Sequence, residues 1–355
     1  MIIELTFVFL LSFSSLLVMR KVGKKIGLVD QPNARKHHVG AVPLVGGISI
    51  CICITAYLLT TPNVLEHYNL YLSSIVLLTF IGALDDKFDL SFKVRLILQA
   101  GLSLCMIYFA EIELNTLGNL FGLGEVSLGI VAPLVTICAV IGAINAFNMV
   151  DGIDGLLGGL SIVTFGAIAV LLGIDKQFGL AYMCLIIVTA MLPYIFMNLG
   201  ILGKERKVFM GDAGSMMIGF TVIWLLLDAS QDPVAPLMRP VTALWLIAVP
   251  LTDMATIMIR RIRRGDSPFK PDREHLHHIF QRLGLSSRQT LVVICSIATA
   301  YAAFGLYGEY AKIPDIIMFI LFVLSFIAYA VMMSNIWKIT SAIRRWRGVP
   351  ERVYE

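Results

Sequence analysis

Charged residues are scarce in this sequence. Asp, Glu, Lys and Arg make up 15% of the 355 residues, whereas apolar residues make up 58%, and the mean hydropathy is +0.84. One water-soluble core could not bury this much apolar surface, which excludes an ordinary soluble domain. The composition therefore predicts an integral membrane protein.

Cysteines offer little chemistry. All six lie inside apolar runs, and the closest pair, Cys51 and Cys53, is two residues apart. Neither a disulfide framework nor a zinc-ligand spacing is visible, so we interpret the cysteines as small core hydrophobes. A Walker A motif and an EF-hand spacing are also missing.

Apolar runs long enough to cross a bilayer recur along the chain. The first has no A-x-A cleavage site and is followed, not preceded, by basic residues, which favours an uncleaved span over a signal peptide. We predict an all-α polytopic bundle of about eleven transmembrane helices, forming a single domain over residues 1–355. The runs lie near residues 2–19, 44–60, 70–84, 95–110, 130–147, 156–173, 180–197, 214–229, 241–258, 291–308 and 314–337.

Basic residues alternate between the two predicted faces. Of the 28 Lys and Arg residues, 25 lie in the segments that connect the apolar runs on one predicted face. Only Lys176, Arg239 and Lys312 lie in the segments on the other face. The positive-inside rule then places the N-terminus outside and the C-terminus in the cytoplasm. The net charge of +4 indicates anchoring to anionic lipids more than nucleic-acid binding. The predicted cytoplasmic loops lie near residues 20–43, 85–95, 148–156, 198–214 and 259–290.

The densest polar stretch, residues 145–155, separates two apolar runs. In a helix, Asn148, Asp151 and Asp154 would share one broad face, and the two glycines beside the aspartates would let backbone approach a ligand. Burying such groups is costly unless partners or a metal compensate. This stretch predicts the centre of a reaction site, with a capping cluster as the alternative.

Three further polar groups map to the same predicted face. Each has a plainer interpretation, as a solvated loop, a helix cap or a basic loop. They are Asp85 and Asp86 with Lys93 and Arg95 just beyond, Asp212 at the start of an apolar run, and His275, His277 and His278 in the longest basic loop. Asp253, inside the ninth run, is a functional candidate or an ion-pair partner of Arg260 or Arg261.

Groups on one face can converge. Carboxylates and an Asn amide suit Mg²⁺ or Mn²⁺, which takes few protein ligands besides phosphate oxygens. Arg, Lys and His around them suit a diphosphate. The residues thus predict a metal-assisted phosphoryl transfer at the inner membrane surface, achieved by positioning and charge neutralisation.

Six short motifs are spread along the chain between residues 32 and 278. They are Pro32-Asn33-x-Arg35-Lys36, Val42-Pro43-Leu44-Val45-Gly46-Gly47, Gly82-Ala83-Leu84-Asp85-Asp86, Asn145-Ala146-Phe147-Asn148-Met149-Val150-Asp151-Gly152-Ile153-Asp154-Gly155, Val208-Phe209-Met210-Gly211-Asp212-Ala213-Gly214-Ser215 and His275-x-His277-His278. Together they resemble the motifs of the polyprenyl-phosphate N-acetylhexosamine-1-phosphate transferases.

The resemblance implies a reaction. GlcNAc-1-phosphate would pass from UDP-GlcNAc to undecaprenyl phosphate, with release of UMP and a requirement for Mg²⁺ or Mn²⁺. Leu276 interrupts the run of histidines that family members using UDP-MurNAc-pentapeptide carry, which favours the simpler donor. The implied setting is the cytoplasmic face of the bacterial inner membrane, at the first membrane step of O-antigen or enterobacterial common antigen synthesis.

The resemblance also implies roles. It assigns metal binding to Asp212 and Asn148, catalysis to Asp85, Asp86, Asp151 and Asp154, and substrate binding to Asn198, Phe209, His275, His277 and His278. Lys93 is a further substrate-binding candidate, because its charge could neutralise a phosphate near Asp85 and Asp86. The expected partners are UDP-GlcNAc, undecaprenyl phosphate and membrane lipids, without nucleic acid; a homodimer is an open alternative.

Other interpretations stay open. A one-step attack is favoured over an aspartyl-phosphate intermediate, because the acceptor phosphate is already anionic. The donor could be another UDP-N-acetylhexosamine. Two alternatives belong to other functional classes. A nucleotide-sugar transporter would place polar groups near the membrane midplane and often consists of two repeated halves, but this sequence shows no internal repeat. A structural membrane subunit would leave the acidic groups without a function.

Overall fold

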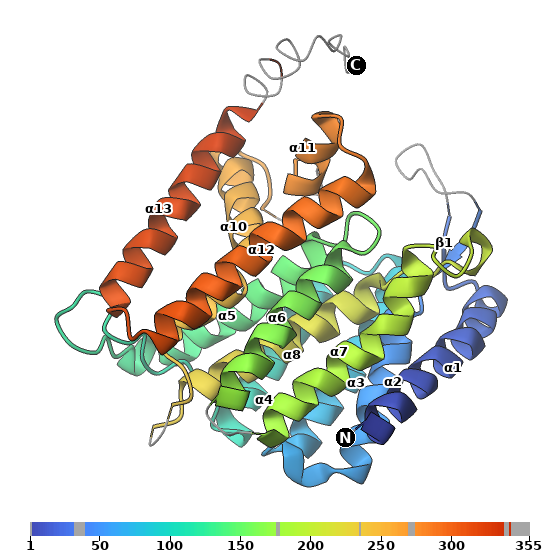
Figure 1. Ribbon diagram of the computed structural model, residues 1–355, viewed down its shortest axis with the longest axis horizontal. Helices are drawn as coiled ribbons and strands as arrows, with labels where there is room; N and C mark the ends of the chain where they lie inside the picture. The colour runs from blue at the N-terminus through green and yellow to red at the C-terminus, as the bar shows by residue number, and fades with distance from the viewer. Residues whose placement is uncertain are drawn as a thin grey trace.

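The computed structural model describes residues 2–31, 40–174, 178–233, 236–268, 274–336 and 341. It shows a bundle of helices with one two-stranded antiparallel pair, β1 (Val29–Asp30) and β2 (Val42–Pro43) (Figure 1). The helices are α1 (Ile2–Ile26), α2 (Gly46–Thr60), α3 (Tyr68–Phe88), α4 (Phe92–Phe109), α5 (Ala132–Met149), α6 (Leu156–Ile174), α7 (Phe178–Asn198), α8 (Gly211–Ser230), α9 (Pro240–Leu246), α10 (Ala248–Arg263), α11 (Leu276–Arg282), α12 (Ser287–Tyr310) and α13 (Asp315–Ser334). The motif at residues 32–36 lies outside the described residues.

The helical membrane-protein class is confirmed, and the number of spans is refined. Among the described residues, nine helices are long and apolar enough to cross a membrane, and α9 with α10 would make a tenth span bent by 83°. The remaining predicted run, near 44–60, forms α2, which is apolar but only 15 residues long. Each of the eleven predicted runs therefore corresponds to one helix or to the bent pair, but α2 is shorter than the helices that could cross a membrane.

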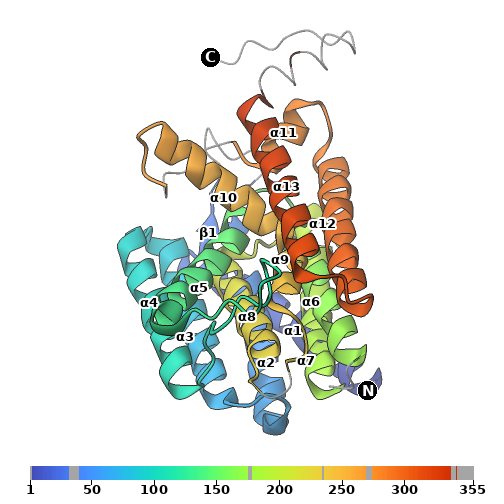
Figure 2. The same cartoon turned by 90° about the vertical axis from the view of Figure 1, so that its left-hand side faces the viewer.

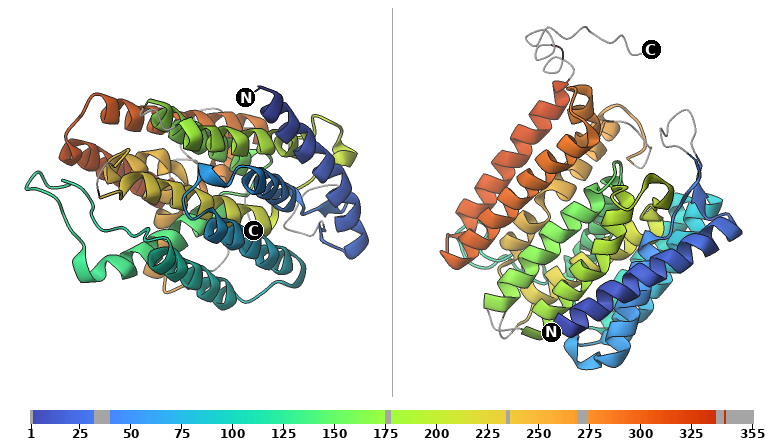
Figure 3. Two further views of the ribbon diagram at one scale, coloured as in Figure 1. Left: turned by 90° about the horizontal axis from the view of Figure 1, so that it is seen from below. Right: turned by 45° about the vertical axis from the view of Figure 1, so that its right-hand side comes forward.

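Helix α8 lies at the centre of the bundle, between α3, α5 and α2 (Figures 2 and 3). Almost all of its residues are buried, including Trp224, which packs against Tyr71 and Phe220. Small residues let its neighbours approach closely, as membrane helices require. A Cβ added at Gly47 would lie 2.1 Å from backbone atoms of Gly214. This packing fixes where α8 begins, and therefore where Asp212 lies.

Some local predictions hold and others do not. Ser286 and Gln289 form the capping box that begins α12. Cys51, Cys53 and Cys184 are buried as predicted, but Cys138 is exposed on α5. That interpretation was wrong because, in a membrane protein, an apolar run can face lipid as well as the protein interior.

The two ends of the bundle differ in chemistry. At one end, Arg239 forms ion pairs with Glu309 at 3.2 Å and with Asp315 at 2.8 Å, which join α9, α12 and α13. The other end holds α11 and the carboxyl ends of α3 and α5. The start of α1 and the end of α13 lie at opposite ends of the bundle (Figure 1).

Candidate active site

The predicted polar groups meet at the end of the bundle that holds α11. Arg95 of α4 lies between two carboxylates: its Nη1 is 2.6 Å from Asp85 Oδ2 and 2.9 Å from Asp212 Oδ2. Asn148 donates from Nδ2 to the other oxygen of Asp212 at 2.7 Å and to the Ser215 hydroxyl at 2.8 Å. Two residues that are far from Asp212 in the sequence, Arg95 and Asn148, thus bind its carboxylate.

Asp86 holds the first turn of α8. Its Oδ1 accepts from the backbone N–H of Asp212 at 2.9 Å, and its Oδ2 accepts from that of Ala213 at 3.3 Å. These are donors that a helix start leaves without an intrahelical partner. Gly211 has φ +74°, and a Cβ there would lie 2.3 Å from Asp86 Oδ2. Glycine is therefore required at this position by backbone conformation and by space.

The stretch that contains Asp151 and Asp154 is a turn. Helix α5 ends at Met149 and α6 begins at Leu156, so the two aspartates do not share a helix face with Asn148, contrary to the helical interpretation. Gly155 has φ +79°, which ends any helical continuation. Asp154 pairs with Lys207, with Nζ 2.6 Å from Oδ2.

Asn198 is buried and ties this turn to the segment before α8. Its Oδ1 accepts from Gly155 N at 2.6 Å, and its Nδ2 donates to the Val208 carbonyl at 2.9 Å. Because Asn198 is buried, a direct contact with a nucleotide would require the surrounding residues to move.

Phe209 is half-buried in the same segment. Its backbone N–H donates to Pro43 and its carbonyl accepts from Gly46, each at 2.9 Å. Its ring lies 5.1 Å from Lys207 Nζ. The glycine-containing loop before α2 thereby fixes the backbone of Phe209.

The three histidines form one cluster over the turn. The rings of His275 and His277 are stacked with centroids 5.7 Å apart, and those of His277 and His278 are 4.1 Å apart. His277 is buried against Gly152, where an added Cβ would lie 2.1 Å from its Nε2. Burial lowers the pKa of His277 well below its usual value of 6.5, and the neighbouring His278 and His275 act in the same direction. His277 is therefore neutral at pH 7.

Comparison with known proteins gives this geometry a context. The model of a family described as glycosyl transferase family 4 matches residues 68–230, from the start of α3 to the end of α8. The chain is 49% identical over 345 residues to the undecaprenyl-phosphate alpha-N-acetylglucosaminyl 1-phosphate transferase of Yersinia pestis, covering 97% of this chain and 94% of that protein. The chain belongs to glycosyl transferase family 4.

Other relatives carry the same name. The protein of Escherichia coli (strain K12) is 50% identical over 345 residues, covering 96% of this chain and 93% of that protein. The protein of Haemophilus influenzae is 44% identical over 346 residues, covering 97% of each chain. The matched family region contains the carboxylates of the site, whereas the histidine cluster lies beyond it, within the length shared with these relatives.

The residues of this family 4 protein fit a hard divalent cation. The position of Arg95 Nη1 shows that one cationic atom can reach carboxylate oxygens of both Asp85 and Asp212. Mg²⁺ commonly takes one or two protein carboxylates and leaves its other positions to water and phosphate. No group of three or more His, Cys, Asp or Glu side chains within the described ranges could hold a metal alone. A turn of the Asn148 amide would present an oxygen as a further ligand.

Sequence reasoning placed some site residues and missed others. Lys93 is exposed in the first turn of α4, and the cation on the carboxylates is instead Arg95, two residues later. Lys207 was not singled out either, although it lies two residues before Phe209. Asp253 binds His275 and Tyr329, whereas Arg260 pairs with Glu274 at 2.8 Å. No spacing rule could have linked Tyr329 to this group.

Asp151 allows a test of the site's electrostatics. Desolvation raises the pKa of Asp151 to about 7, and the carboxylates of Asp212 and Asp154 act in the same direction. The residue is nevertheless accessible to solvent. Because the pKa in the folded protein is above its usual value of 3.8, the wild type should lose stability as the pH rises from that value to about 7.

We therefore expect Asp151→Asn to melt at a higher temperature than the wild type at pH 8, and this advantage should shrink at pH 5. Solvent screening limits the difference to at most about a few degrees. The measurement is thermal unfolding in detergent with EDTA at both pH values. A difference that is the same at pH 5 and pH 8 would show that the carboxylate is not destabilised in the fold.

Proposed function

We propose that this protein transfers GlcNAc-1-phosphate from UDP-GlcNAc to undecaprenyl phosphate, giving undecaprenyl-diphosphate-GlcNAc and UMP. The observation that carries the proposal is the meeting of Asp85 and Asp212 at one cation position, beside the turn of Asp151 and Asp154. A diphosphate held by a divalent ion needs such a place. The name of the relatives gives undecaprenyl phosphate and an alpha-N-acetylglucosaminyl 1-phosphate group as the reacting partners, and the match extends over almost the whole chain.

The reaction would join an oxygen of the acceptor phosphate to the phosphorus that carries GlcNAc and break that phosphorus's bond to the bridging oxygen of UMP. Asp212, Asp85 and the Asn148 amide would hold Mg²⁺ or Mn²⁺, which when bound would neutralise the charge that develops as UMP leaves. Asp86 would keep Asp212 in place through the start of α8. The acceptor phosphate is anionic at neutral pH, so the attack needs no covalent intermediate on the protein.

Two basic side chains would neutralise the phosphates of the substrates. Arg95 forms ion pairs with Asp85 and Asp212, and Lys207 forms an ion pair with Asp154. With a cation bound to the two carboxylates, the guanidinium of Arg95 would turn away from them, and phosphate oxygens would be the preferred alternative partners for its N–H groups. Lys207 would act in the same way beside the nucleotide, with Phe209 next to it.

We infer that the site faces the cytoplasm from the bacterial inner membrane, where the pathway would be O-antigen or enterobacterial common antigen synthesis. The support is the alternation of Lys and Arg and the collection of the polar groups at the end of the bundle where α13 ends. A cysteine at Asp89 in a cysteine-free background should react with a membrane-impermeant reagent only after permeabilisation. Reaction in intact cells would contradict this orientation.

The decisive experiment measures UMP release from UDP-GlcNAc by the protein in detergent. We expect release only when polyprenyl phosphate and Mg²⁺ or Mn²⁺ are both present. Release without lipid would indicate hydrolysis instead of transfer. Uptake of intact UDP-GlcNAc into proteoliposomes without UMP release would support a transporter.

Two finer points need separate assays. A panel of UDP-sugars tests the donor, and UDP-GlcNAc should be used in preference to UDP-MurNAc-pentapeptide. Rapid quenching with UDP-GlcNAc alone should give no phosphorylated aspartate if the transfer takes one step. A phosphorylated aspartate that passes its group to the lipid would establish two steps.

A further inference from the structure

Asp253 is a buried carboxylate outside the cation position. It lies in the second turn of α10, shortly after the 83° bend from α9, and its exposed fraction is 2%. A buried charge is strongly unfavourable unless it is paired and hydrogen-bonded. Its partners therefore indicate why an aspartate is found at this position.

Three donors from two other segments converge on this carboxylate. His275 Nδ1 lies 2.8 Å from Oδ2, while Oδ1 accepts from the Leu276 backbone N–H at 3.1 Å and from the Tyr329 hydroxyl at 2.5 Å. An ionised carboxylate can only accept, so the Nδ1 of His275 must carry the proton. Asp253 thus fixes both the ring of His275 and the first residue of α11, and Tyr329 links the pair to α13.

A second contact holds the same segment. Nearer the carboxyl end of α10, Arg260 pairs with Glu274, the residue before His275, at 2.8 Å. Asp253 and Arg260 therefore bind three consecutive residues, Glu274, His275 and Leu276, at the entry to α11. These contacts tie the entry of α11 to α10.

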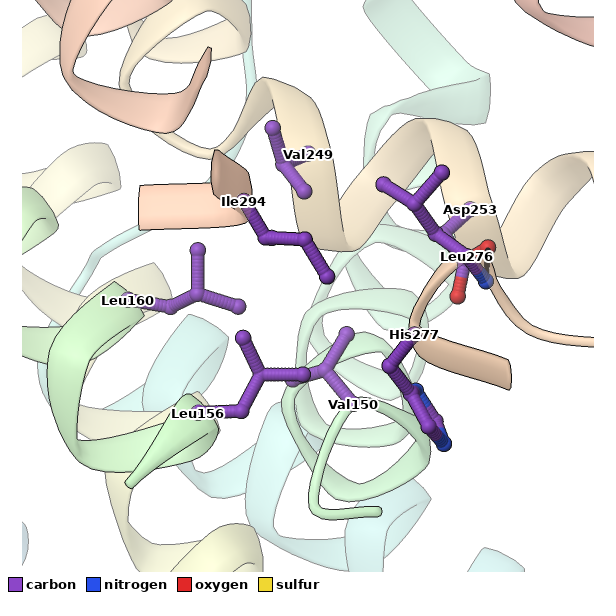
Figure 4. Close-up of a pocket in the computed structure, with 8 residues that line it drawn as sticks. All are labelled: Val150, Leu156, Leu160, Val249, Asp253, Leu276, His277 and Ile294. Carbon is purple, nitrogen blue, oxygen red and sulfur yellow. Dashed lines mark hydrogen bonds between the residues drawn. The ribbon is translucent and has the colours of Figure 1, made fainter. Parts of the chain in front are cut away.

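From His275 the contacts lead to the reaction centre. His275 stacks on His277, and His277 packs on Gly152, the residue after Asp151. Asp253, Leu276 and His277 line a cavity of about 10 Å³ (Figure 4), whose remaining walls are the apolar side chains of Val150 and of residues in α6, α10 and α12.

We propose that Asp253 and Tyr329 are positioning residues for the transfer reaction, which hold His275 and the first turn of α11 over the turn of Asp151. The inference rests on the proposed function, in which the histidine cluster meets the diphosphate and sugar of UDP-GlcNAc. Helix α13 then contributes to the site through Tyr329, although Tyr329 itself touches no substrate.

The test is Tyr329→Phe, which removes one hydroxyl and preserves the ring. We expect the KM for UDP-GlcNAc to rise about 10- to 20-fold, the lower part of the range for loss of a hydrogen bond to a charged group, with the KM for polyprenyl phosphate unchanged. Tyr307→Phe is the matched control, because Tyr307 is exposed near the other end of the neighbouring helix α12, and it should behave as the wild type. In a His275→Gln background, Tyr329→Phe should add no further loss, because it acts through His275.

Several results would overturn the proposal. They are an unchanged KM for UDP-GlcNAc, equal changes in the KM of both substrates, or losses that add fully in the double variant. Hydrogen exchange gives a readout that needs no reaction: the amide of Leu276 should exchange faster in Tyr329→Phe and not in Tyr307→Phe. If the wild type releases no UMP, the proposed function fails, while faster exchange would still support the positioning contact and unchanged exchange would reject it.

Discussion

Asp212→Asn should lose nearly all UMP release, by roughly 10²- to 10³-fold, the range observed when one charge-stabilising group is removed from an active site. The variant should also need a higher Mg²⁺ or Mn²⁺ concentration for its residual activity. The reason is that Asp212 supplies one of the two carboxylates at the cation position, and the neutral amide is a weaker ligand. The measurement is UMP release as a function of metal concentration.

Asp89→Asn is the matched control. Asp89 lies at the same end of the bundle, is exposed, and has φ +52°, a conformation that Asn adopts more easily than most residues. The same chemical change there should leave both the rate and the metal optimum as in the wild type. If Asp212→Asn kept its activity at the original metal optimum, the assignment of Asp212 to the metal would be wrong.

Gly82→Ala should inactivate the protein although it changes no polar group. A Cβ at Gly82 would lie 2.5 Å from backbone atoms of Ala213, and neither backbone can turn aside. Helices α3 and α8 would have to separate, which would move Asp85 and Asp86 away from Asp212. Overpacking of this kind typically costs about 1–3 kcal/mol, and a displacement of about 1 Å at a reaction centre can cost about 10²-fold in rate.

Gly101→Ala provides the comparison, because Gly101 is an exposed helical glycine of α4 with open space around its Cα. Replacing it should leave the activity unchanged and stabilise the helix by about 0.5–1 kcal/mol. Thermal unfolding in detergent and UMP release measure both effects. An active, stable Gly82→Ala protein would show that the contact between α3 and α8 does not control the site.

Part of the site followed from residue type and spacing. Asp85, Asp212 and Asn148 are polar groups at the ends of apolar runs, where polar residues are so costly that they indicate a functional role. The histidines form a cluster in the longest basic loop. The same reasoning noted Arg95 beside Asp85 and Asp86 but assigned it no role, and it did not single out Lys207. Cations beside a membrane are common, because they also bind lipid headgroups, so their presence alone did not single them out.

The errors have physical causes as well. The helical face proposed for Asn148, Asp151 and Asp154 was wrong, because α5 ends at Met149 and Gly155 takes a left-handed conformation. The run near 241–258 was treated as one span, but its chain turns by 83° between α9 and α10. Hydropathy responds to the apolar content of a run and not to its direction.

The sequence by itself determined that this is a helical membrane protein, which ends of the helices carry reactive groups, and to which family the motifs point. These properties depend on composition, order and spacing along the chain. Only the tertiary structure decided that Arg95 joins Asp85 to Asp212, although Asp212 lies 117 residues after Arg95 in the sequence. The same is true of Asp253, which binds both His275 and Tyr329. Such pairings depend on how closely whole helices pack, and that is set by many small contacts, such as Gly82 against Ala213, which no local pattern encodes.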